Sequence, residues 1–345
     1  MMKPNSAQHF SVAPMLDLTD KHCRVFHRKL SQKTWLYSEM VTTGAILFGQ
    51  NDQRFLGKDD SDNPVVLQLG GSVVTEMVQC AQKGEQWGYD EININVGCPS
   101  DRVQNNAIGA CLMNTPEVVA GCVKAMKDSV DVPVTVKCRI GIDEQDEQKS
   151  IRNMLEQLIE AGVDGVIIHA RKAWLQGLSP KENRHVPPLN YALVQTVKEE
   201  YPELAIAING GIQSLEQGLE ICHENKKNAI DGFMIGRTAY EQPFMLTEVD
   251  EKIYGQSRFR KSREQIVHEM IPYIDSHIEN GGKLIQITRH MLGLYHGLPG
   301  GRMWRRHLSQ QAFKKDATSQ TVLDALKIVQ DEISRMQEYL ESKNK

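Results

Sequence analysis

The sequence lacks any long apolar run. Nowhere does it approach the roughly 18 uninterrupted apolar residues that a membrane-spanning helix needs. Its first ten residues, MMKPNSAQHF, also lack the apolar core of a secretory signal peptide. These two absences argue against a membrane protein and against a secreted one. We therefore expect a cytoplasmic protein that does not associate with a membrane.

Close pairs of cysteines are missing as well. The seven cysteines, from Cys23 to Cys222, are an odd number and form no C-x-x-C motif. Disulfide frameworks use even sets of cysteines, and zinc or iron–sulfur sites usually draw their ligands from close pairs. We expect free thiols in a reducing compartment, most of them packed as small buried side chains, and no metal site.

Charge is distributed unevenly along the chain. Residues 1–250 contain 24 Lys and Arg against 33 Asp and Glu, whereas residues 251–345 contain 16 against 11. The change of sign predicts a second module with a partner of its own. A polyanion suits an excess of positive charge, although a solvated helical face is an equally good interpretation of charge alone.

Eight short apolar or alternating segments recur at regular spacing in the first two-thirds of the chain, with helical patterns between them. They are residues 10–16, 36–41, 65–71, 91–98, 132–141, 164–171, 205–212 and 231–237. Strands that alternate with helices indicate a parallel sheet, and eight repeats in this length predict an α/β fold, the (β/α)8 TIM barrel. An open doubly wound sheet is the alternative, but no G-x-G-x-x-G follows an early strand.

Helix starts and a helical C-terminal region are also visible. Pro116 stands just inside one expected helix, and Ser214 to Gln217 has the pattern of a capping box. After Tyr240 apolar residues recur at helical spacing only. We therefore expect a catalytic barrel over residues 1–243, followed by an all-helical domain over residues 244–345.

Barrel active sites lie at the carboxyl ends of the strands, so the residues that close each expected strand are candidates. Gly210 and Gly211 follow the seventh strand, and Gly236 and Arg237 follow the eighth. Glycines at these two strands expose backbone N–H groups to an anion, which favours a cofactor that carries a phosphate. Single Gly dipeptides also serve ordinary turns, so the argument rests on their joint position.

Other strand ends carry residues suited to a flavin. Lys137 would stabilise negative charge on a reduced isoalloxazine ring, and Gln68 would hydrogen-bond its pyrimidine edge. Cys98 closes the fourth strand within NVGCPS and precedes Pro99, which ends the strand's hydrogen bonding. A packed thiol and a general acid beside the flavin are both open interpretations of this cysteine.

Five longer strings carry a resemblance to a known family. They are NVGCPSDRVQNNAIGACLM, VKCRIGID, IIHARKAWLQGLSPKENR, INGGI and ITRHMLGLYHGLPGGRMWRRHLS. Together they resemble the tRNA-dihydrouridine synthases, specifically their A subfamily, and the similarity extends over nearly the whole chain. The resemblance implies a flavin-dependent oxidoreductase: an FMN-binding barrel with a helical tRNA-binding domain, in which NADPH reduces the flavin.

The reaction that this resemblance implies is reduction of the C5–C6 double bond of uridine to 5,6-dihydrouridine, at positions 20 and 20a of the tRNA D-loop. Cys98 would be the catalytic acid. The FMN contacts would be Pro14, Met15, Leu16, Gln68, Lys137, His169, Asn209, Gly210, Gly211, Gly236 and Arg237.

The implied substrate contacts are Asn95 beside the uracil, and Lys181, Arg184, Arg302 and Arg305 on the tRNA. If GRMWRR is helical, Arg302 and Arg305 share one face. No protein partner is expected. Two other functions remain open from the residues: an FMN-dependent reductase or dehydrogenase of a free pyrimidine, and a tRNA-binding factor without catalysis.

Overall fold

A computed structural model describes residues 4–100, 107–224, 229–256 and 260–343 of the chain. Within them, each of the eight expected strand segments overlaps one strand of a single parallel sheet, and β2 extends one residue beyond its segment. The strands are β1 (Phe10–Val12), β2 (Leu36–Thr42), β3 (Val65–Gly70), β4 (Glu91–Val96), β5 (Val134–Arg139), β6 (Gly165–His169), β7 (Ile206–Asn209) and β8 (Gly232–Ile235).

The sheet closes into a barrel. Its order is β1-β8-β7-β6-β5-β4-β3-β2, and β1 meets the start of β2 through Trp35. The Val12 N–H donates to the Trp35 carbonyl at 2.9 Å, and the Trp35 N–H donates to the Phe10 carbonyl at 3.1 Å. Closure of this kind leaves no free sheet edge. The expected TIM barrel is confirmed, and the open doubly wound alternative is excluded.

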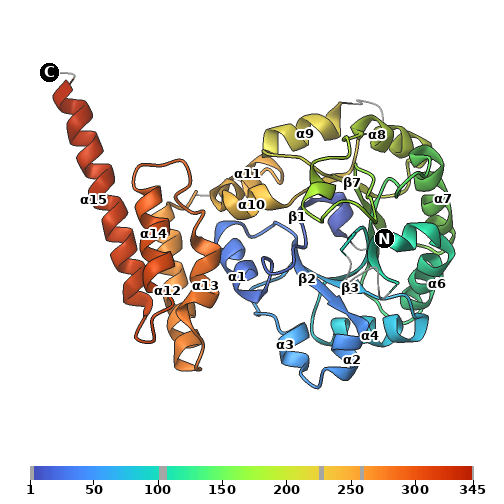
Figure 1. Cartoon of the computed structure of the whole chain (residues 1–345), viewed down its shortest axis with the longest axis horizontal. Helices are drawn as coiled ribbons and strands as arrows, with labels where there is room; N and C mark the ends of the chain where they lie inside the picture. The colour runs from blue at the N-terminus through green and yellow to red at the C-terminus, as the bar shows by residue number, and fades with distance from the viewer. Residues whose placement is uncertain (1–3, 101–106, 225–228, 257–259, 344–345) are drawn as a thin grey trace. The chain divides into compact units, whose positions relative to one another are not determined.

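Helices surround the strands (Figure 1). They are α2 (Thr43–Phe48), α3 (Asp52–Leu56), α4 (Val74–Gln86), α6 (Pro116–Lys127), α7 (Glu147–Glu160), α8 (Tyr191–Glu200) and α9 (Leu215–His223). Pro116 opens α6 as expected, and the Ser214 hydroxyl accepts from the Gln217 N–H at the start of α9. The reciprocal bond of the expected capping box is shifted, because Gln217 Oε1 accepts from the N–H of Gln213.

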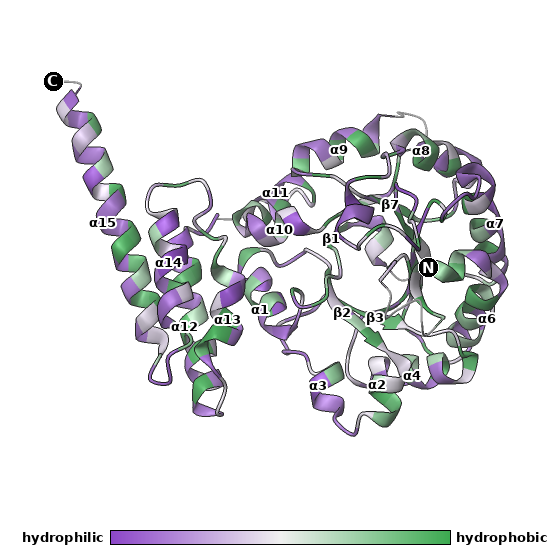
Figure 2. Cartoon of the chain, viewed as in Figure 1, coloured by the Kyte–Doolittle hydropathy of each residue, from purple (hydrophilic) through white to green (hydrophobic). Residues whose placement is uncertain are grey.

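Residues along each strand alternate between the helices and the barrel interior. On the outer side, the rings of Phe10 and Phe233 meet edge to face with their centroids 5.1 Å apart. A Cβ on Gly218 of α9 would come within 2.2 Å of the Phe233 ring, so this helix packs directly on β8. Figure 2 shows both polar and apolar residues along α6 and α7, as expected of helices with one face on a sheet.

The inner side of the strands carries the complementary set of residues. Met234 of β8 faces inward and belongs to a buried interior cluster with Tyr37, Val66, Ile167 and Ala207. The short helix η1 (Ser6–Gln8) closes the end of the barrel at which the strands begin. Ser6 and Ala7 of η1 are fully buried there. The interior is therefore a packed core with one closed end.

A second compact unit contains residues 22–33 and 237–345. Its helices are most of α1 (Lys21–Leu30), then α10 (Arg237–Glu241), η4 (Pro243–Glu248), α11 (Val249–Lys252), α12 (Arg263–Glu279), α13 (Leu284–Met291), α14 (Gly301–Gln311) and α15 (Ser319–Lys343). The contacts thus differ in two respects from the expected boundary after residue 243: they divide the chain after Gly236, and they group an early segment with the C-terminal helices.

Specific polar contacts explain why residues 22–33 group with the C-terminal helices. The buried carboxylate of Asp250 accepts hydrogen bonds from the Ser31 hydroxyl and from the Gln32 and Lys33 N–H groups, at 2.5, 2.9 and 3.1 Å. These partners are more than 200 residues apart in the chain, so no local pattern announces them. Among the described residues, no helix is both long and apolar enough to cross a membrane.

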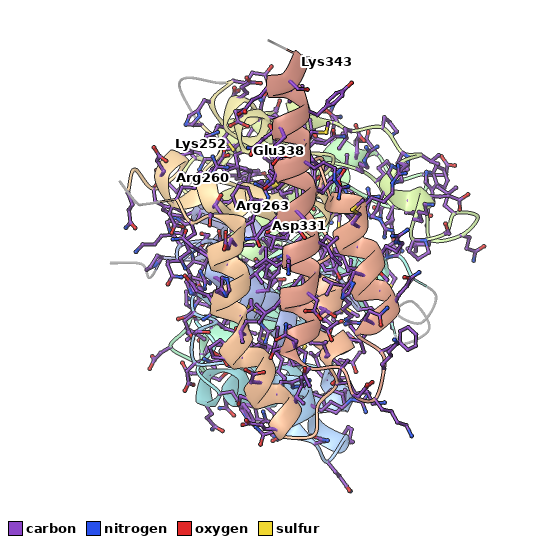
Figure 3. The ribbon with its side chains drawn as sticks, turned by 90° about the vertical axis from the view of Figure 1, so that its left-hand side faces the viewer. Lys252, Arg260, Arg263, Asp331, Glu338 and Lys343 are labelled. Atoms are coloured by element: carbon purple, nitrogen blue, oxygen red, sulfur yellow. The ribbon has the colours of Figure 1, made fainter. Side chains whose placement is uncertain are left out.

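The beginning of α12 is held by an aromatic contact within the second unit. Arg260 and Arg263, both labelled in Figure 3, lie over the ring of Phe244 with their guanidinium carbons 5.0 and 3.5 Å from its centroid. Arg263 also donates to the Leu294 carbonyl at 2.7 Å. A cation over an aromatic face stabilises such a contact by roughly 0.5–2 kcal/mol.

Candidate active site at the carboxyl ends of the strands

Five expected site residues form one inward-facing row where the strands end. Gln68, Asn95, Lys137, His169 and Asn209 come from β3, β4, β5, β6 and β7 in turn. Asn95 pairs with Lys137 in register, and His169 pairs with Asn209. Lys137 Nζ donates to Asn209 Oδ1 at 3.2 Å although β6 lies between their strands. The structure therefore brings these five side chains together inside the mouth of the barrel.

Asn95 holds the loop that carries Cys98. Its Oδ1 accepts from the backbone N–H groups of Gly97 and Cys98, at 3.1 and 3.0 Å. The thiol of Cys98 lies 3.5 Å from the Ser100 hydroxyl and is partly exposed. All seven cysteines are free and five are buried, so Cys98 and Cys111 differ from the packed majority. The loop thus presents the Cys98 thiol at the rim instead of packing it in the core.

Lys137 is a cation with unused hydrogen-bonding capacity. Its bond to Asn209 is the single hydrogen bond its ammonium makes within the described residues, although an ammonium has three donors. Burial and then the neighbouring Arg139 lower the pKa of Lys137 to about 8. A partly desolvated ammonium of this kind favours an anionic or strongly accepting group beside it.

His169 lies among cations. Burial lowers its pKa well below the usual range, and Arg139, Lys137, Arg171 and Arg184 lower it further. The imidazole is therefore neutral at physiological pH. Although residues 1–250 carry a net negative charge, the rim around His169 is electropositive, and such a concentration of positive charge attracts phosphate groups.

Glycines bring the backbone close to this row. Gly210 and Gly211 have φ angles of +114° and +70°, in the region that favours glycine. A Cβ on Gly210 would come within 2.6 Å of the His169 ring, and one on Gly211 within 2.7 Å of Leu189. The Tyr191 hydroxyl donates to the Gly210 carbonyl. Side chains are thus excluded at both positions; Gly210 is buried against His169 and Leu189, whereas Gly211 is exposed.

The segment after β1 lies beside the end of β8. An ideal Cβ on Gly236 would stand 3.6 Å from Met15 Sδ. The Met15 N–H donates to the Thr19 hydroxyl at 3.0 Å, which fixes the turn. Pro14 and Met15 are partly exposed, and Leu16 is 67% exposed. These three apolar side chains are at least partly exposed at the mouth, so they suit contact with a ligand that has an apolar face.

The long connection after β6 carries Lys181 and Arg184, which are both exposed; Lys181 precedes the short helix η3 (Glu182–Arg184), and Arg184 ends it. Asn183 between them is fully buried, and its side chain bonds the backbone of Trp174 at 2.7 and 2.8 Å. Arg139 joins this connection to the Cys98 loop, because it donates to the carbonyls of Asn183 and Gly97 at 3.1 and 3.2 Å. Two loops of the rim therefore share one buried guanidinium.

The remaining expected site residues lie in the second unit. Arg237 begins α10 directly after Gly236 and is exposed. GRMWRR is helical, as its spacing required, and Arg302 and Arg305 are exposed on α14. Trp304 between them is buried and donates to the Met291 carbonyl at 2.9 Å. Within the described residues neither Arg302 nor Arg305 has a hydrogen bond or ion pair, so both guanidinium groups are available to a ligand.

Sequence reasoning missed three interior residues below the row. Glu91, Asn93 and Thr135 are fully buried and share hydrogen bonds. A signal was present, because polar residues at 91, 93 and 95 alternate with apolar ones and so face one side of β4. The role of Arg139 was missed for a different reason: it links two loops through backbone carbonyls far away in the chain, those of Gly97 and Asn183. Asn183 was missed because it bonds the backbone of its own connection, at Trp174, and no sequence pattern marks such a bond.

Comparisons with known proteins agree on one family. A family model described as Dihydrouridine synthase (Dus) matches residues 11–332. The chain is 52% identical over 329 residues to a tRNA-dihydrouridine(20/20a) synthase of Shewanella oneidensis, covering 95% of this chain and 96% of that protein. It is 52% identical to the Vibrio cholerae protein of the same name, over 92% of this chain and 95% of that one. It is 51% identical to that of Escherichia coli K12, over 93% and 92%.

Among solved structures, the chain is similar to a 2-naphthoyl-CoA reductase in complex with 2-naphthoyl-CoA. The TM-score is 0.51 at 12% identity, covering 70% of this chain and 50% of that one. At this identity the similarity concerns the fold alone.

A pH dependence of stability follows from Glu91. Burial raises the pKa of this carboxyl to about 7 in spite of the opposing hydrogen bonds from Ser6 and Thr135. Between about pH 4.5 and 7 the native state therefore binds a proton that the unfolded state has released, so the contribution of Glu91 to stability falls as pH rises through this window. We expect the free energy of unfolding of wild type relative to Glu91→Gln to decrease from pH 5 to pH 8 in urea titrations. A pH-independent difference would contradict the raised pKa.

Proposed function

The chain belongs to the dihydrouridine synthase family, and on that premise we propose that it reduces uridines of tRNA to 5,6-dihydrouridine. The proposed targets are positions 20 and 20a of the D-loop, with FMN as cofactor and NADPH as reductant. The observation that carries the proposal is the inward row of Gln68, Asn95, Lys137, His169 and Asn209 beside the partly exposed thiol of Cys98. The relatives named for this reaction are similar over more than nine-tenths of the chain.

The residues at the barrel mouth fit a flavin mononucleotide. Lys137 has unused donors for the electron-rich edge of the ring, and Gln68 has a carboxamide in the same row. The backbone N–H groups at Gly210, Gly211 and Gly236 would face the phosphate, and Arg237, which is exposed, would add positive charge. Pro14, Met15 and Leu16 would cover an apolar face of the ring, with His169 and Asn209 completing the contacts.

The chemistry that FMN would supply when bound and reduced by NADPH is the hydride for C6 of the uracil. The chain itself supplies the other half of the addition. Cys98 would donate a proton from Sγ to C5 and regain one from solvent, so that the double bond gains one hydride and one proton. Asn95 would orient the uracil while it holds the Cys98 loop by two hydrogen bonds. NADPH leaves as NADP⁺, which balances the electrons.

A uridine stacked inside folded tRNA cannot reach the barrel mouth, so the target nucleotide must be turned out at a cost of a few kcal/mol. Contacts to the RNA backbone would offset this cost. Lys181 and Arg184 are exposed on the connection after β6, and Arg302 and Arg305 are exposed on α14. We assign catalysis to residues 1–243 and tRNA binding mainly to residues 244–345. A tRNA substrate and free cysteines support a cytoplasmic location.

The reaction is tested by incubating the purified protein with NADPH and unmodified tRNA, then mapping dihydrouridine by mass spectrometry. We expect dihydrouridine at positions 20 and 20a, and none where these uridines are replaced by cytidine. Cys98→Ala is expected to retain flavin and NADPH oxidation but to lose most dihydrouridine formation, because the proton donor is gone. No product at any D-loop uridine would refute the function. Turnover of free uracil or orotate instead would favour the free-pyrimidine alternative.

The contribution of α14 to tRNA binding has a matched control on the same helix. We expect Arg302→Ala and Arg305→Ala each to weaken tRNA affinity roughly tenfold at physiological salt, because each removes a charge-assisted contact to RNA. NADPH oxidation should be unchanged. Arg306→Ala, which removes an exposed neighbour outside the proposed pair, should bind tRNA as wild type does in filter-binding titrations. Equal affinity of all four proteins would contradict this assignment.

A further inference from the structure

Five side chains form a continuous hydrogen-bonded chain through the barrel interior. We call it the interior chain, and its members are Glu91, Thr135, Asn93, Gln68 and Asn95. Thr135 donates to Glu91 at 2.5 Å, Asn93 to Thr135 at 2.9 Å, Gln68 to Asn93 at 2.8 Å and Asn95 to Gln68 at 2.8 Å. The interior chain runs from the closed end of the barrel, which we call its floor, to the inward row at the mouth. Each of its five members is at most 9% exposed.

All bonds of the interior chain point in one direction, and its two ends determine that direction. At the mouth, Asn95 accepts from the N–H groups of Gly97 and Cys98, which act only as donors. Its oxygen must therefore face the loop and its NH₂ must face Gln68. At the floor, ionised Glu91 acts only as an acceptor. Each carboxamide in between consequently has a single orientation that satisfies both neighbours.

The floor end of the interior chain is itself fixed. Glu91 accepts from the Ser6 N–H at 2.6 Å and from the Ser6 hydroxyl at 2.7 Å, and that hydroxyl lies 2.5 Å from the Tyr37 hydroxyl. Ser6 belongs to η1, which closes the barrel floor. The carboxylate therefore has a set position, and aligned hydrogen bonds in a medium of low dielectric constant reinforce one another.

We propose that Glu91, Asn93 and Thr135 are positioning residues for the reaction: through the interior chain they orient the Gln68 and Asn95 carboxamides and hold the Cys98 loop. The inference rests on the proposed function for its catalytic consequence, although the orientation of the loop does not depend on it. None of the three residues reaches the mouth of the barrel. Gln68 and Asn95 do, because they belong to the inward row at the strand ends. The effect of the three positioning residues is transmitted by hydrogen bonds alone.

Loss of a middle link would leave the carboxamides above it without a required direction. Thr135 is the most informative link, because its hydroxyl both accepts from Asn93 and donates to Glu91. Thr135→Val keeps the shape of the side chain and removes the hydroxyl, leaving the Asn93 NH₂ without an acceptor. Thr135→Ser removes only the methyl group and keeps the link. The pair therefore separates hydrogen bonding from packing.

The test compares wild type, Thr135→Val and Thr135→Ser as purified holoenzymes at pH 8. Amide hydrogen exchange is followed at Gly97 and Cys98, and dihydrouridine formation is resolved into kcat and KM for tRNA. We expect Thr135→Val to increase the exchange rate of these two amides roughly tenfold and to lower kcat roughly tenfold, because this is the scale of one buried hydrogen bond. The KM for tRNA should be unchanged. Thr135→Ser should remain within about twofold of wild type. Exchange in α7 should be equal in all three.

Wild-type behaviour of Thr135→Val in both measurements would overturn the inference, as would a Thr135→Ser variant as impaired as Thr135→Val, because packing would then be the cause. If Thr135→Val does not fold, Asn93→Leu removes the adjacent link with an apolar side chain of similar size. It should show the same local loss, and wild-type exchange at Gly97 and Cys98 in this variant would overturn the inference too. Failure of the proposed function can be distinguished from failure of this inference. In that case the wild-type protein itself would form no dihydrouridine, and the comparison of amide exchange would still test the interior chain.

Discussion

Glu91, Asn93 and Asn95 lie inside the barrel with at most 9% of their surface exposed, so their polar groups need partners from the protein itself. This constraint determines the site more than any single residue does. β4 alone places Glu91, Asn93 and Asn95 on its inner face, and each of them has a partner on β3, on β5 or in η1. An unpartnered group at this depth would cost roughly 1–3 kcal/mol. The arrangement is therefore satisfied as a whole, and a change at the floor has a direct physical route to the mouth.

Electrostatics complement this arrangement at the open end. Lys137, Arg139 and Arg171 gather around a neutral His169, within a unit whose sequence is acidic overall. Concentrated positive charge at one end of an acidic unit would favour phosphate groups at that end. The depressed pKa of Lys137 shows that its charge is poorly solvated, which makes an anionic ligand beside it favourable.

Much of this was predictable from the sequence because the responsible forces are local or periodic. The eight strands follow from apolar segments of regular spacing, and the row from Gln68 to Asn209 follows from polar residues at strand ends. For Cys98, composition and position left packing and catalysis both open, and only the resemblance to the family implied the role of catalytic acid. Contacts of long range were not predictable: Asp250 binds residues 31–33, Arg139 joins two loops, and Tyr191 supports Gly210. Each depends on the folded path of the chain instead of on neighbouring residues.

We propose the inward row at the strand ends as the flavin site. This proposal is tested most directly by titrating FMN, followed by its fluorescence, with the flavin-free forms of wild type, Lys137→Met and Lys149→Met. Lys149 is exposed on α7 and serves as the matched control. We expect one bound FMN for wild type and Lys149→Met, and an affinity at least tenfold weaker for Lys137→Met. Equal affinity of all three proteins, or no binding by wild type, would contradict it.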